Sequence, residues 1–355
     1  MANRYAVVMA GGSGERFWPL STPERPKQLL RLTHPDQTML EEAVRRIEPL
    51  VGSDRVFVAT SSTIYEAVRA TSVVPGDRLL SEPARRDTLG AIAWIVANLI
   101  ARGEGDATVA ILTSDHKIGA PERFRRTVDA ALNLAELRPG IVVIGVPPTR
   151  PESGYGYIES DADSIVRMGD RIAHPIQSFR EKPSRETAEE FVRQGRFLWN
   201  SGMFFFSIPS FMEELELTQP GPAETVREIA ACLERQDLAA ARVAFERLPR
   251  LSIDYAVMER ARHAFVVAAD FPWDDVGAWD ALDRTFIPDW AGNVVIGPAT
   301  MVDAWNNVVY NDRPDVRVGV LGVHGLVVVN TDRGVLVCPK GLAQRVREVA
   351  SPMGE

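Results

Sequence analysis

Two basic side chains stand on either side of a proline-rich stretch near the start of the chain. Arg16 follows the glycines Gly11, Gly12 and Gly14, and Lys27 comes directly after the last of three prolines. Glycine amides without side chains can approach an anion, and a guanidinium together with an ammonium can balance a polyphosphate. The prolines exclude an immediate helix and predict an extended arm that returns Lys27 to the loop. A tight turn carrying solvated charges is the alternative interpretation.

Neither common nucleotide-binding motif fits this glycine loop. A GxGxxG dinucleotide fingerprint needs a third glycine where Phe17 stands. A Walker loop needs GxxxxGK followed by Ser or Thr, and no register of these glycines supplies that pattern. The Rossmann dinucleotide and P-loop interpretations are therefore excluded.

Two acidic motifs, TSDH at residues 113–116 and WDDVGAW at residues 273–279, could hold a metal ion. Asp115 follows a buried apolar run, at the edge where parallel sheets place ligand-binding groups. In isolation, an Asp at this place is more often a turn or cap residue. Asp274 and Asp275 are adjacent, so their side chains should point to opposite sides and only one can face a metal. Mg²⁺ prefers one or two carboxylates together with phosphate oxygens and water.

Short runs rich in valine and isoleucine alternate with helical patterns in the first part of the chain. The runs lie at residues 5–9, 56–60, 109–113 and 141–146. Such runs are typical of strands buried on both faces of a parallel sheet. Apolar residues recur with helical spacing at residues 40–47 and 88–102, and these helices would cover the sheet. The pattern predicts a doubly wound α/β fold.

The pattern changes twice further along the chain. Hairpin-like pieces begin near residue 150, followed by a helix from about residue 187 to Gln194 that Gly195 can cap, and then by a largely helical stretch. Beyond residue 288 apolar and polar residues alternate between Gly, Asn and Asp turns, which predicts a small all-β unit. We therefore predict two domains, at residues 1–287 and 288–355.

Composition excludes two broad classes of protein. The net charge of −8 argues against a general nucleic-acid binder, although basic residues outnumber acidic ones in residues 1–31. No apolar run approaches the roughly 20 residues that span a bilayer, so a membrane protein is not expected. The start of the chain has no pattern of an export signal, and we expect a cytoplasmic protein.

Further motifs share one order with a known enzyme family. After the glycine loop come RRDT, TSDH, GYGYIE, EKP, LWNSGMF, SIDYAVME and WDDVGAW. In this order they resemble the sugar-1-phosphate nucleotidyltransferases, and most closely the mannose-1-phosphate guanylyltransferases. The resemblance implies a Rossmann-like, mixed or parallel doubly wound sheet. It also implies a small β-helix-like C-terminal domain that makes homodimer contacts.

The resemblance implies an activity as well. GMP would pass from GTP to mannose 1-phosphate, giving GDP-mannose and pyrophosphate, with Mg²⁺ as the cofactor. Longer members carry a cupin-type isomerase domain, for which residues 288–355 are too few, so isomerase activity is not expected. A sister enzyme with another nucleotide or sugar, or a non-catalytic nucleotide-sugar sensor, are the alternatives.

Site residues follow from the same motifs. The resemblance implies catalytic roles for Arg16, Lys27 and Asp115, and metal binding by Asp115 and Asp275. It implies nucleotide binding by Gly11, Gly12, Gly14, Glu82, Arg86, Asp87 and Thr88. It implies sugar binding by Gly154, Tyr155, Glu181, Lys182, Asn200 and Asp254.

One position departs from the family pattern. The family usually has Asn where this chain has Asp87. An aspartate accepts hydrogen bonds but cannot donate them as asparagine does. Asp87 could accept from guanine or cap the helix that follows, and Glu82 is the alternative acceptor for the base.

Overall fold

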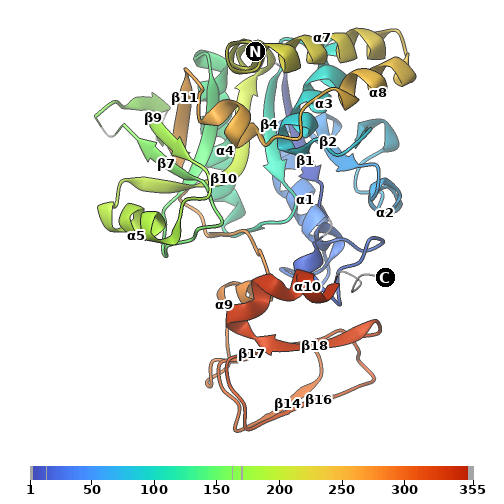
Figure 1. Ribbon diagram of the computed structural model, residues 1–355, viewed down its shortest axis with the longest axis vertical. Helices are drawn as coiled ribbons and strands as arrows, with labels where there is room; N and C mark the ends of the chain where they lie inside the picture. Colours follow the sequence, from blue (N-terminus) through green and yellow to red (C-terminus); the bar gives the residue numbers. More distant parts are fainter. Residues whose placement is uncertain (1–2, 13, 162, 169–170, 351–355) are drawn as a thin grey trace.

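A ten-stranded sheet forms the centre of the larger part of the molecule (Figure 1). The computed structural model describes residues 3–12, 14–161, 163–168 and 171–350. The strands are β1 (Arg4–Ala10), β2 (Val56–Ser61), β3 (Leu79–Glu82), β4 (Thr108–Thr113), β6 (Ile141–Val146), β7 (Tyr157–Ser160), β8 (Val166–Met168), β9 (Arg171–Arg180), β10 (Phe197–Ser207) and β11 (Ala264–Ala268). They are arranged in the order β3-β2-β1-β4-β10-β6-β11-β9-β7, and β8 pairs with β9.

The sheet is mixed. Strands β1, β2, β3 and β4 run parallel to one another, whereas β10 runs antiparallel to both β4 and β6. The four apolar runs are strands β1, β2, β4 and β6, as predicted. The hairpin-like pieces are confirmed as the antiparallel pair β7 and β9, and β7 also pairs with β10.

Helices cover both faces of the sheet (Figure 1). They are α1 (Met39–Val51), α2 (Tyr65–Ala70), α3 (Asp87–Ala101), α4 (Pro121–Leu137), α5 (Arg185–Gln194), α6 (Ile208–Thr218), α7 (Pro220–Glu234) and α8 (Leu238–Glu246). Side chains of β1 alternate between two cores: Val7 packs with α3 and α7, and Ala6 and Val8 pack with α1 and α4. None of the helices described here combines the length and the apolar composition needed to cross a membrane.

Local capping sets two of these helix ends. At the start of α1, Thr38 and Glu41 form a reciprocal capping box. Helix α5 ends at Gly195, whose φ of 70° is left-handed, as the sequence predicts.

The C-terminal unit is a short β-helix. Its strands are β13 (Val294–Ile296), β14 (Ala299–Val302), β15 (Val308–Asn311), β16 (Val318–Leu321), β17 (Leu326–Thr331) and β18 (Gly334–Pro339). Strands β13, β15 and β17 form one parallel sheet, and β14 and β16 form a second. Strand β18 returns antiparallel to β17 through the TDRG turn. Stacked asparagines bond across successive coils, as Asn307 does to Asn293 and Asn330 does to Asn311.

One aromatic core joins the β-helix to the opening loop. Trp279 is fully buried, with its ring 5.1 Å from that of Phe17 and 5.3 Å from that of Tyr310. Its indole N–H donates to the carbonyl of Trp18 at 3.0 Å. Trp279 therefore links Phe17 of the loop to Tyr310 of the C-terminal unit, and all three side chains belong to one core. We retain residue 287, between α9 (Leu282–Thr285) and β13, as the proposed domain boundary.

Candidate active site

The predicted site residues converge on one edge of the sheet. Strands β1, β3 and β4 are parallel to one another in the sheet, so their carboxyl ends meet there. The glycine loop follows β1, Glu82 ends β3, and Asp115 follows β4. Asp275 reaches the same edge because β12 (Trp273–Asp274) pairs with β5 (Lys117–Ile118), which comes directly after the TSDH motif.

Two cavities meet at Asp115. The first, of about 330 Å³, is lined by Gly14, Glu15, Arg16, Phe17, Lys27, Asp115, His116, Asp275, Gly277 and Arg347. The second, also of about 330 Å³, is lined by Met9, Gly11, Gly12, Ala59, Ser61, Glu82, Arg85, Arg86, Asp87, Thr88, Ala91, Thr113 and Asp115. The aspartate therefore stands where a ligand occupying both cavities would pass from one to the other.

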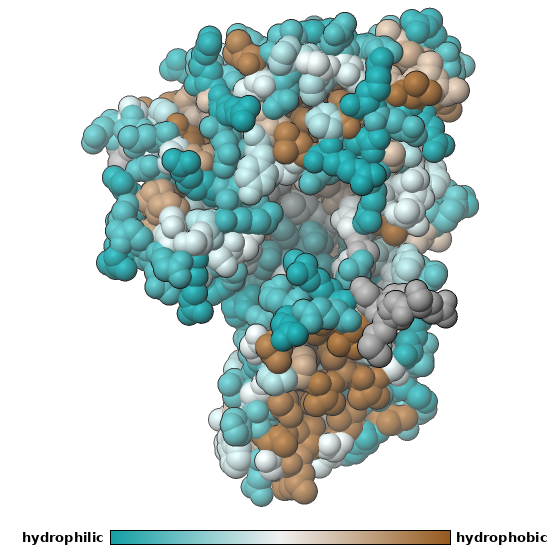
Figure 2. Space-filling model, in the orientation of Figure 1, coloured by the Kyte–Doolittle hydropathy of each residue, from teal (hydrophilic) through white to brown (hydrophobic). Residues whose placement is uncertain are grey.

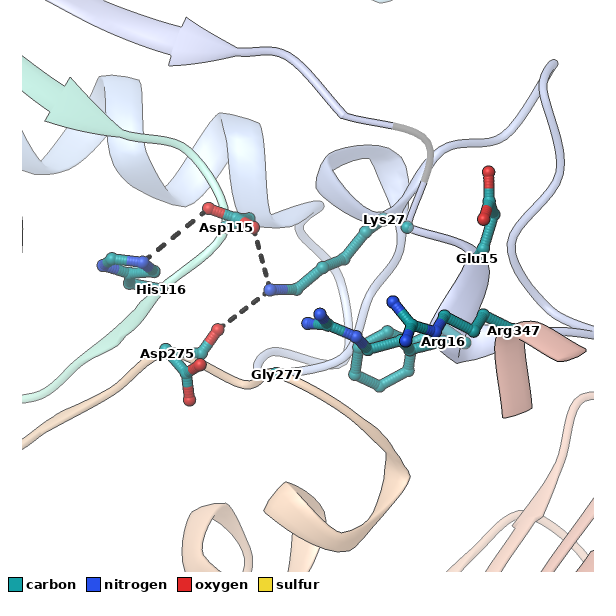
Figure 3. A pocket seen from close by; sticks show the side chains of 10 residues that line it. Glu15, Arg16, Lys27, Asp115, His116, Asp275, Gly277 and Arg347 are labelled. Atoms are coloured by element: carbon teal, nitrogen blue, oxygen red, sulfur yellow. Dashed lines mark hydrogen bonds and ion pairs between the residues drawn. The ribbon is translucent and has the colours of Figure 1, made fainter. Parts of the chain in front are cut away.

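Lys27 is the centre of the first cavity (Figure 3). Its Nζ donates to Asp115 Oδ2 at 2.8 Å and to the backbone carbonyl of Asp275 at 2.8 Å. The lysine side chain is only 10% exposed. Burial alone would raise the pKa of Asp115, but the nearby ammonium of Lys27 brings it below its ordinary value. The lysine thus places a positive charge between the two aspartates predicted to bind the metal.

Gly14 allows this approach. A Cβ at Gly14 would lie 2.5 Å from the Cβ of Lys27, and its φ of 65° is left-handed. A Cβ at Gly11 or Gly12 would meet nothing within 4 Å, so the space beside those two residues is open. Open backbone of this kind is what a phosphate cradle requires. Ser13 lies outside the described residues.

The prediction of an extended arm was wrong in detail. Around the prolines, residues 18–20 form a turn and residues 23–25 a bend, and the backbones of Thr22 and Arg25 exchange hydrogen bonds of 3.0 and 3.1 Å. A 3₁₀ turn lies on either side, at Glu15–Phe17 and Lys27–Leu29. The side chain of Gln28 donates to the carbonyl of Ala10 at 3.2 Å and fastens the segment to the end of β1. Lys27 does return to the loop, by turns rather than by an extended chain.

The excess of basic residues near the loop does not all face the site. Arg4 pairs with Asp129 and Glu136 on α4, at 2.7 and 2.6 Å. Arg25 pairs with Asp312 of the β-helix at 3.1 Å. The positive charge at the cavities is therefore smaller than the count of basic residues in residues 1–31 suggests, because these two arginines bind acidic residues far along the chain.

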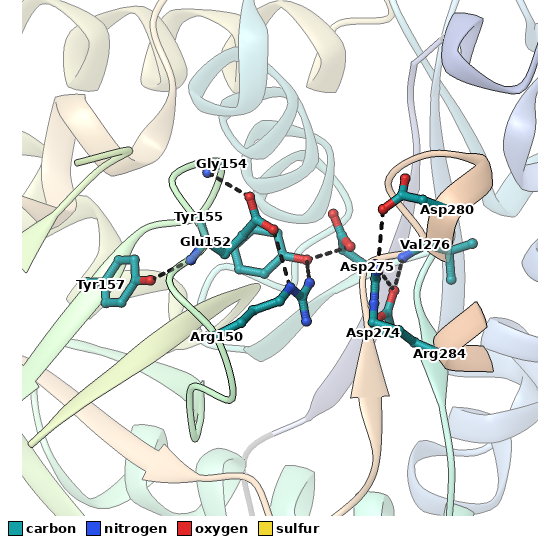
Figure 4. Close-up of polar contacts among 10 residues, drawn as sticks. All are labelled: Arg150, Glu152, Gly154, Tyr155, Tyr157, Asp274, Asp275, Val276, Asp280 and Arg284. Atoms are coloured by element: carbon teal, nitrogen blue, oxygen red, sulfur yellow. Dashed lines mark hydrogen bonds and ion pairs between the residues drawn. The ribbon is translucent and has the colours of Figure 1, made fainter. Parts of the chain in front are cut away.

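Asp274 and Asp275 point to different partners, as predicted (Figure 4). Asp274 is buried and accepts from Arg284 Nε at 2.7 Å and from the N–H of Val276 at 2.8 Å. Asp275 lines the first cavity and accepts from the Tyr155 hydroxyl at 2.5 Å. A Cβ at Gly277 would lie 2.7 Å from Asp275 Oδ2, so a glycine leaves room for that carboxylate.

His116 lies beside the two aspartates as a neutral side chain. Burial lowers its pKa, which keeps the imidazole uncharged. Its Nδ1 accepts from the indole N–H of Trp273 at 3.2 Å and lies 2.8 Å from the hydroxyl of Thr113. Nε2 then carries the proton and faces Asp115 Oδ1 at 3.9 Å. The histidine supports the position of Asp115 without adding charge.

Three of the predicted nucleotide residues, Arg86, Asp87 and Thr88, lie at the N-terminal end of α3. Thr88 accepts from the N–H of Ile253 at 2.9 Å, and Arg86 Nε donates to the carbonyl of Glu246 at 3.1 Å. These two contacts fasten α3 to the end of α8 and the segment that follows it. Asp87 accepts from the N–H of the next residue, Thr88, at 2.7 Å, but the N-cap position of α3 is Arg86 and the helix has no side-chain cap bond.

Glu82 is the buried acid of the second cavity. Burial raises its pKa to about 7, with a further increase from Asp87 and a decrease from Arg85. Because Asp87 already accepts from the N–H of Thr88, we expect Glu82 to be the better placed acceptor for a base edge.

The predicted sugar residues form a third cluster. Lys182 Nζ pairs with Glu181 Oε1 at 2.8 Å, and Asn200 Nδ2 donates to Asp254 Oδ1 at 2.9 Å. Burial and the nearby Glu181 raise the pKa of Asp254 to about 7. Gly154 is exposed, and its N–H donates to Glu152.

Tyr155 connects this third cluster to the aspartates. Its ring packs edge-on against Trp199, next to Asn200, while its hydroxyl donates to Asp275. Burial, and then the neighbouring Asp275, raise the pKa of this phenol, so it stays protonated as the donor. Sequence reasoning missed Arg150, which lies over the Trp199 ring and donates to the Tyr155 hydroxyl at 3.2 Å.

Three residues of the site have a left-handed backbone, as do other non-glycine residues elsewhere in the chain. Asp87, Lys182 and Val276 have left-handed φ values of 59°, 44° and 47°. For a β-branched residue such as Val276 this conformation is a genuine outlier. Strain of this kind persists where the surrounding structure holds functional groups in place.

The fold and this arrangement define a nucleotidyltransferase, and the chain belongs to the nucleotidyl transferase family, which matches residues 5–286. Residues 297–352 match a second family, the MannoseP isomerase/GMP-like beta-helix domain. Both matches agree with the α/β and β-helix parts of the structure.

Particular relatives are similar over nearly the whole chain. A mannose-1-phosphate guanylyltransferase of Escherichia coli K12 is 36% identical over 97% of this chain and 72% of its own length. The alginate biosynthesis protein AlgA of Pseudomonas fluorescens is 35% identical over 98% of this chain and 71% of its own length. A solved structure described as mannose-1-phosphate geranyltransferase from Thermus thermophilus has a TM-score of 0.85 and 38% identity, covering 98% of both chains.

The contrast between Asp274 and Asp275 gives a matched pair of variants. Asp275→Asn should lower kcat by about a hundredfold or more while leaving unfolding unchanged, because it removes the charge of a carboxylate that lines the first cavity. Asp274→Asn should keep most of the turnover and lose about 1 kcal/mol of stability, since Arg284, its partner, is one-third exposed. Steady-state kinetics and urea unfolding of both proteins check this. The reverse pattern, with Asp274 essential for turnover, would contradict the assignment.

Proposed function

We propose that this nucleotidyltransferase transfers GMP from GTP to mannose 1-phosphate, giving GDP-mannose and pyrophosphate. The observation that carries the proposal is the meeting of three binding regions at Asp115 and Asp275. Asp115 lines both the second cavity, which contains Glu82, and the first cavity, which contains Lys27. Tyr155 joins Asp275 to the third cluster. The names of the similar proteins support the guanine nucleotide and the mannose phosphate.

Each region suits one part of the substrates. The second cavity, with Glu82 at its end, would hold the guanine and ribose. The first cavity, with Arg16 and Lys27, would hold the β- and γ-phosphates. Glu181, Asn200 and Asp254 would bind the sugar hydroxyls, because fixed acceptors and donors can tell one epimer from another.

The two aspartates fit Mg²⁺. Both offer hard carboxylate oxygens, and Lys27 already places a positive charge against the carboxylate of one and the carbonyl of the other. Magnesium binds through one or two carboxylates plus substrate phosphates. We propose that Asp115 and Asp275 hold Mg²⁺, which when bound would neutralise charge on the phosphates.

The transfer needs no protein nucleophile. A phosphate oxygen of mannose 1-phosphate forms a bond to the α-phosphorus of GTP, and the bond from that phosphorus to the bridging oxygen breaks. Pyrophosphate leaves with the electron pair. The chain contributes by positioning the two phosphates and by balancing their charge through Lys27 and Arg16.

A product assay tests the proposal directly. With GTP, mannose 1-phosphate and Mg²⁺, the protein should release pyrophosphate and form GDP-mannose, identified by mass spectrometry. ATP, UTP, CTP or dTTP, and glucose 1-phosphate, serve as competing substrates. A clear preference for another pair would indicate a sister enzyme. Absence of pyrophosphate with every pair would indicate a non-catalytic sensor.

Base recognition by Glu82 predicts a pH effect. Its raised pKa of about 7 means that the carboxyl is neutral below pH 7 and ionised above it. Only the ionised form accepts both hydrogens of the guanine N1–H and exocyclic amine. The KM for GTP should therefore fall about tenfold between pH 6 and pH 8.

The matched variant for this prediction is Glu82→Gln. The KM for GTP is measured against pH for both proteins. In the variant, the pH dependence should shrink to the part that ionisation of GTP itself causes. If Asp87→Asn rather than Glu82→Gln has this effect, the base contact belongs to Asp87.

We also propose a homodimer through the C-terminal β-helix. Val335 and Val337 of β18 are 60% and 59% exposed, and they lie on the same face of the sheet as Val328, which packs between the two sheets. Among the described residues, β16 is the last strand of the smaller sheet, and Leu321 on it is 70% exposed. Figure 2 shows a broad hydrophobic area on this unit. An open end of a repeat structure needs a cover, and a second copy would supply one.

A charge substitution tests the dimer. Val335→Lys combined with Val337→Lys should convert a dimer to a monomer, seen as a halved mass by light scattering. Val243→Lys, at an equally exposed valine on α8, is the control and should leave the mass unchanged. A monomeric wild-type protein, or a double variant that remains dimeric, would contradict this interface.

A further inference from the structure

An arginine from the end of the described chain lines the phosphate cavity. Arg347 begins α10 (Arg347–Ala350), which follows the β-helix and a 3₁₀ segment at Lys340–Val346. It shares the first cavity with Arg16, Lys27 and Asp115. Figure 3 shows the side chains of Arg16 and Arg347 both extending towards Lys27. No sequence motif singles out this arginine.

The position of Arg347 relative to Asp115 determines what it would meet. In the proposed function the base and ribose lie in the second cavity, and among the described residues Asp115 alone lines both cavities. A triphosphate whose α-phosphate lies at Asp115 must extend its remaining phosphates into the first cavity. Arg347 lies on the wall of that cavity and is absent from the wall of the other, as far as the described residues line them.

The first cavity needs more than one cationic side chain if it is to bind these phosphates. Lys27 is bound to Asp115, so much of its charge is balanced before any substrate arrives. Glu15, Asp115 and Asp275 line the same space and add negative charge. A guanidinium can donate two parallel hydrogen bonds to two oxygens of one phosphate. Pyrophosphate has two phosphate groups, so each of two arginines can bind one of them.

We propose that Arg347 binds the β- and γ-phosphates of the nucleotide and the pyrophosphate that leaves. Arg16 binds the same group from the opening loop. The inference rests on the proposed function, and it makes the C-terminal unit part of the active site. The aromatic core of Phe17, Trp279 and Tyr310 fixes the distance between the two arginines, because it joins the loop to the β-helix.

Kinetics in both directions test this role. Arg347→Ala should raise the KM for GTP and, in the reverse reaction, the KM for pyrophosphate by about ten- to a hundredfold, as expected for lost charge-assisted hydrogen bonds. The KM values for mannose 1-phosphate and GDP-mannose should stay within about twofold, because neither molecule carries the outer phosphates. Arg347→Lys should recover part of the loss.

Arg345→Ala is the matched control. Arg345 lies two residues earlier, pairs with Glu348 at 2.8 Å and does not line the cavity. It should leave all four KM values unchanged. An Arg347→Ala protein with an unaltered KM for pyrophosphate would overturn the proposal, as would equal increases for pyrophosphate and GDP-mannose, which indicate a structural role.

Direct binding separates this inference from the proposed function. Titration calorimetry with magnesium pyrophosphate should show about ten- to a hundredfold weaker binding to Arg347→Ala than to the wild-type protein. This measurement does not depend on which base or sugar the enzyme uses. Equal affinities would refute the role of Arg347 even if GDP-mannose is the product, and a difference would support it even if another nucleotide is preferred.

Discussion

The contact of Lys27 with Asp115 and Asp275 is the interaction on which the site depends. It joins three segments far apart in the chain: the arm after the glycine loop, the end of β4, and the turn after β12. Other features follow from it. Gly14 must lack a side chain so that Lys27 can lie close, and Gly277 must lack one so that Asp275 has room. Without the lysine, two carboxylates and a glutamate would face one another across a partly enclosed space, which is unfavourable.

The aromatic core around Trp279 is a second constraint, on the segment that follows the glycine loop. The Trp279 core makes the opening loop and the β-helix parts of one packed unit. This explains why a small C-terminal unit accompanies the catalytic fold so closely. It shares a core with the segment that follows the glycine loop, and the 3₁₀ segment after β18 brings Arg347 to the first cavity.

Several residues implied by the family pattern turn out to hold others in place. Arg86 and Thr88 bond to backbone groups of residues 246 and 253, and Asp87 accepts from the N–H of Thr88. Asp254 directly follows Ile253, whose N–H donates to the Thr88 hydroxyl, so this contact joins the start of α3 to the segment that carries Asp254.

The sequence by itself determined the α/β class and the β-rich end, and it singled out the motifs that carry Asp115 and Asp275. Those features rest on local patterns: buried strands give apolar runs, loops give glycines and prolines, and Asp115 and Asp275 sit in distinctive short motifs. Only the tertiary structure decided that Lys27 pairs with Asp115 rather than facing the phosphates alone, that Arg4 and Arg25 turn away, and that Arg347 enters the site. These outcomes depend on contacts between residues far apart in the chain, and the spacing of residue types along a chain does not encode which distant charges will meet.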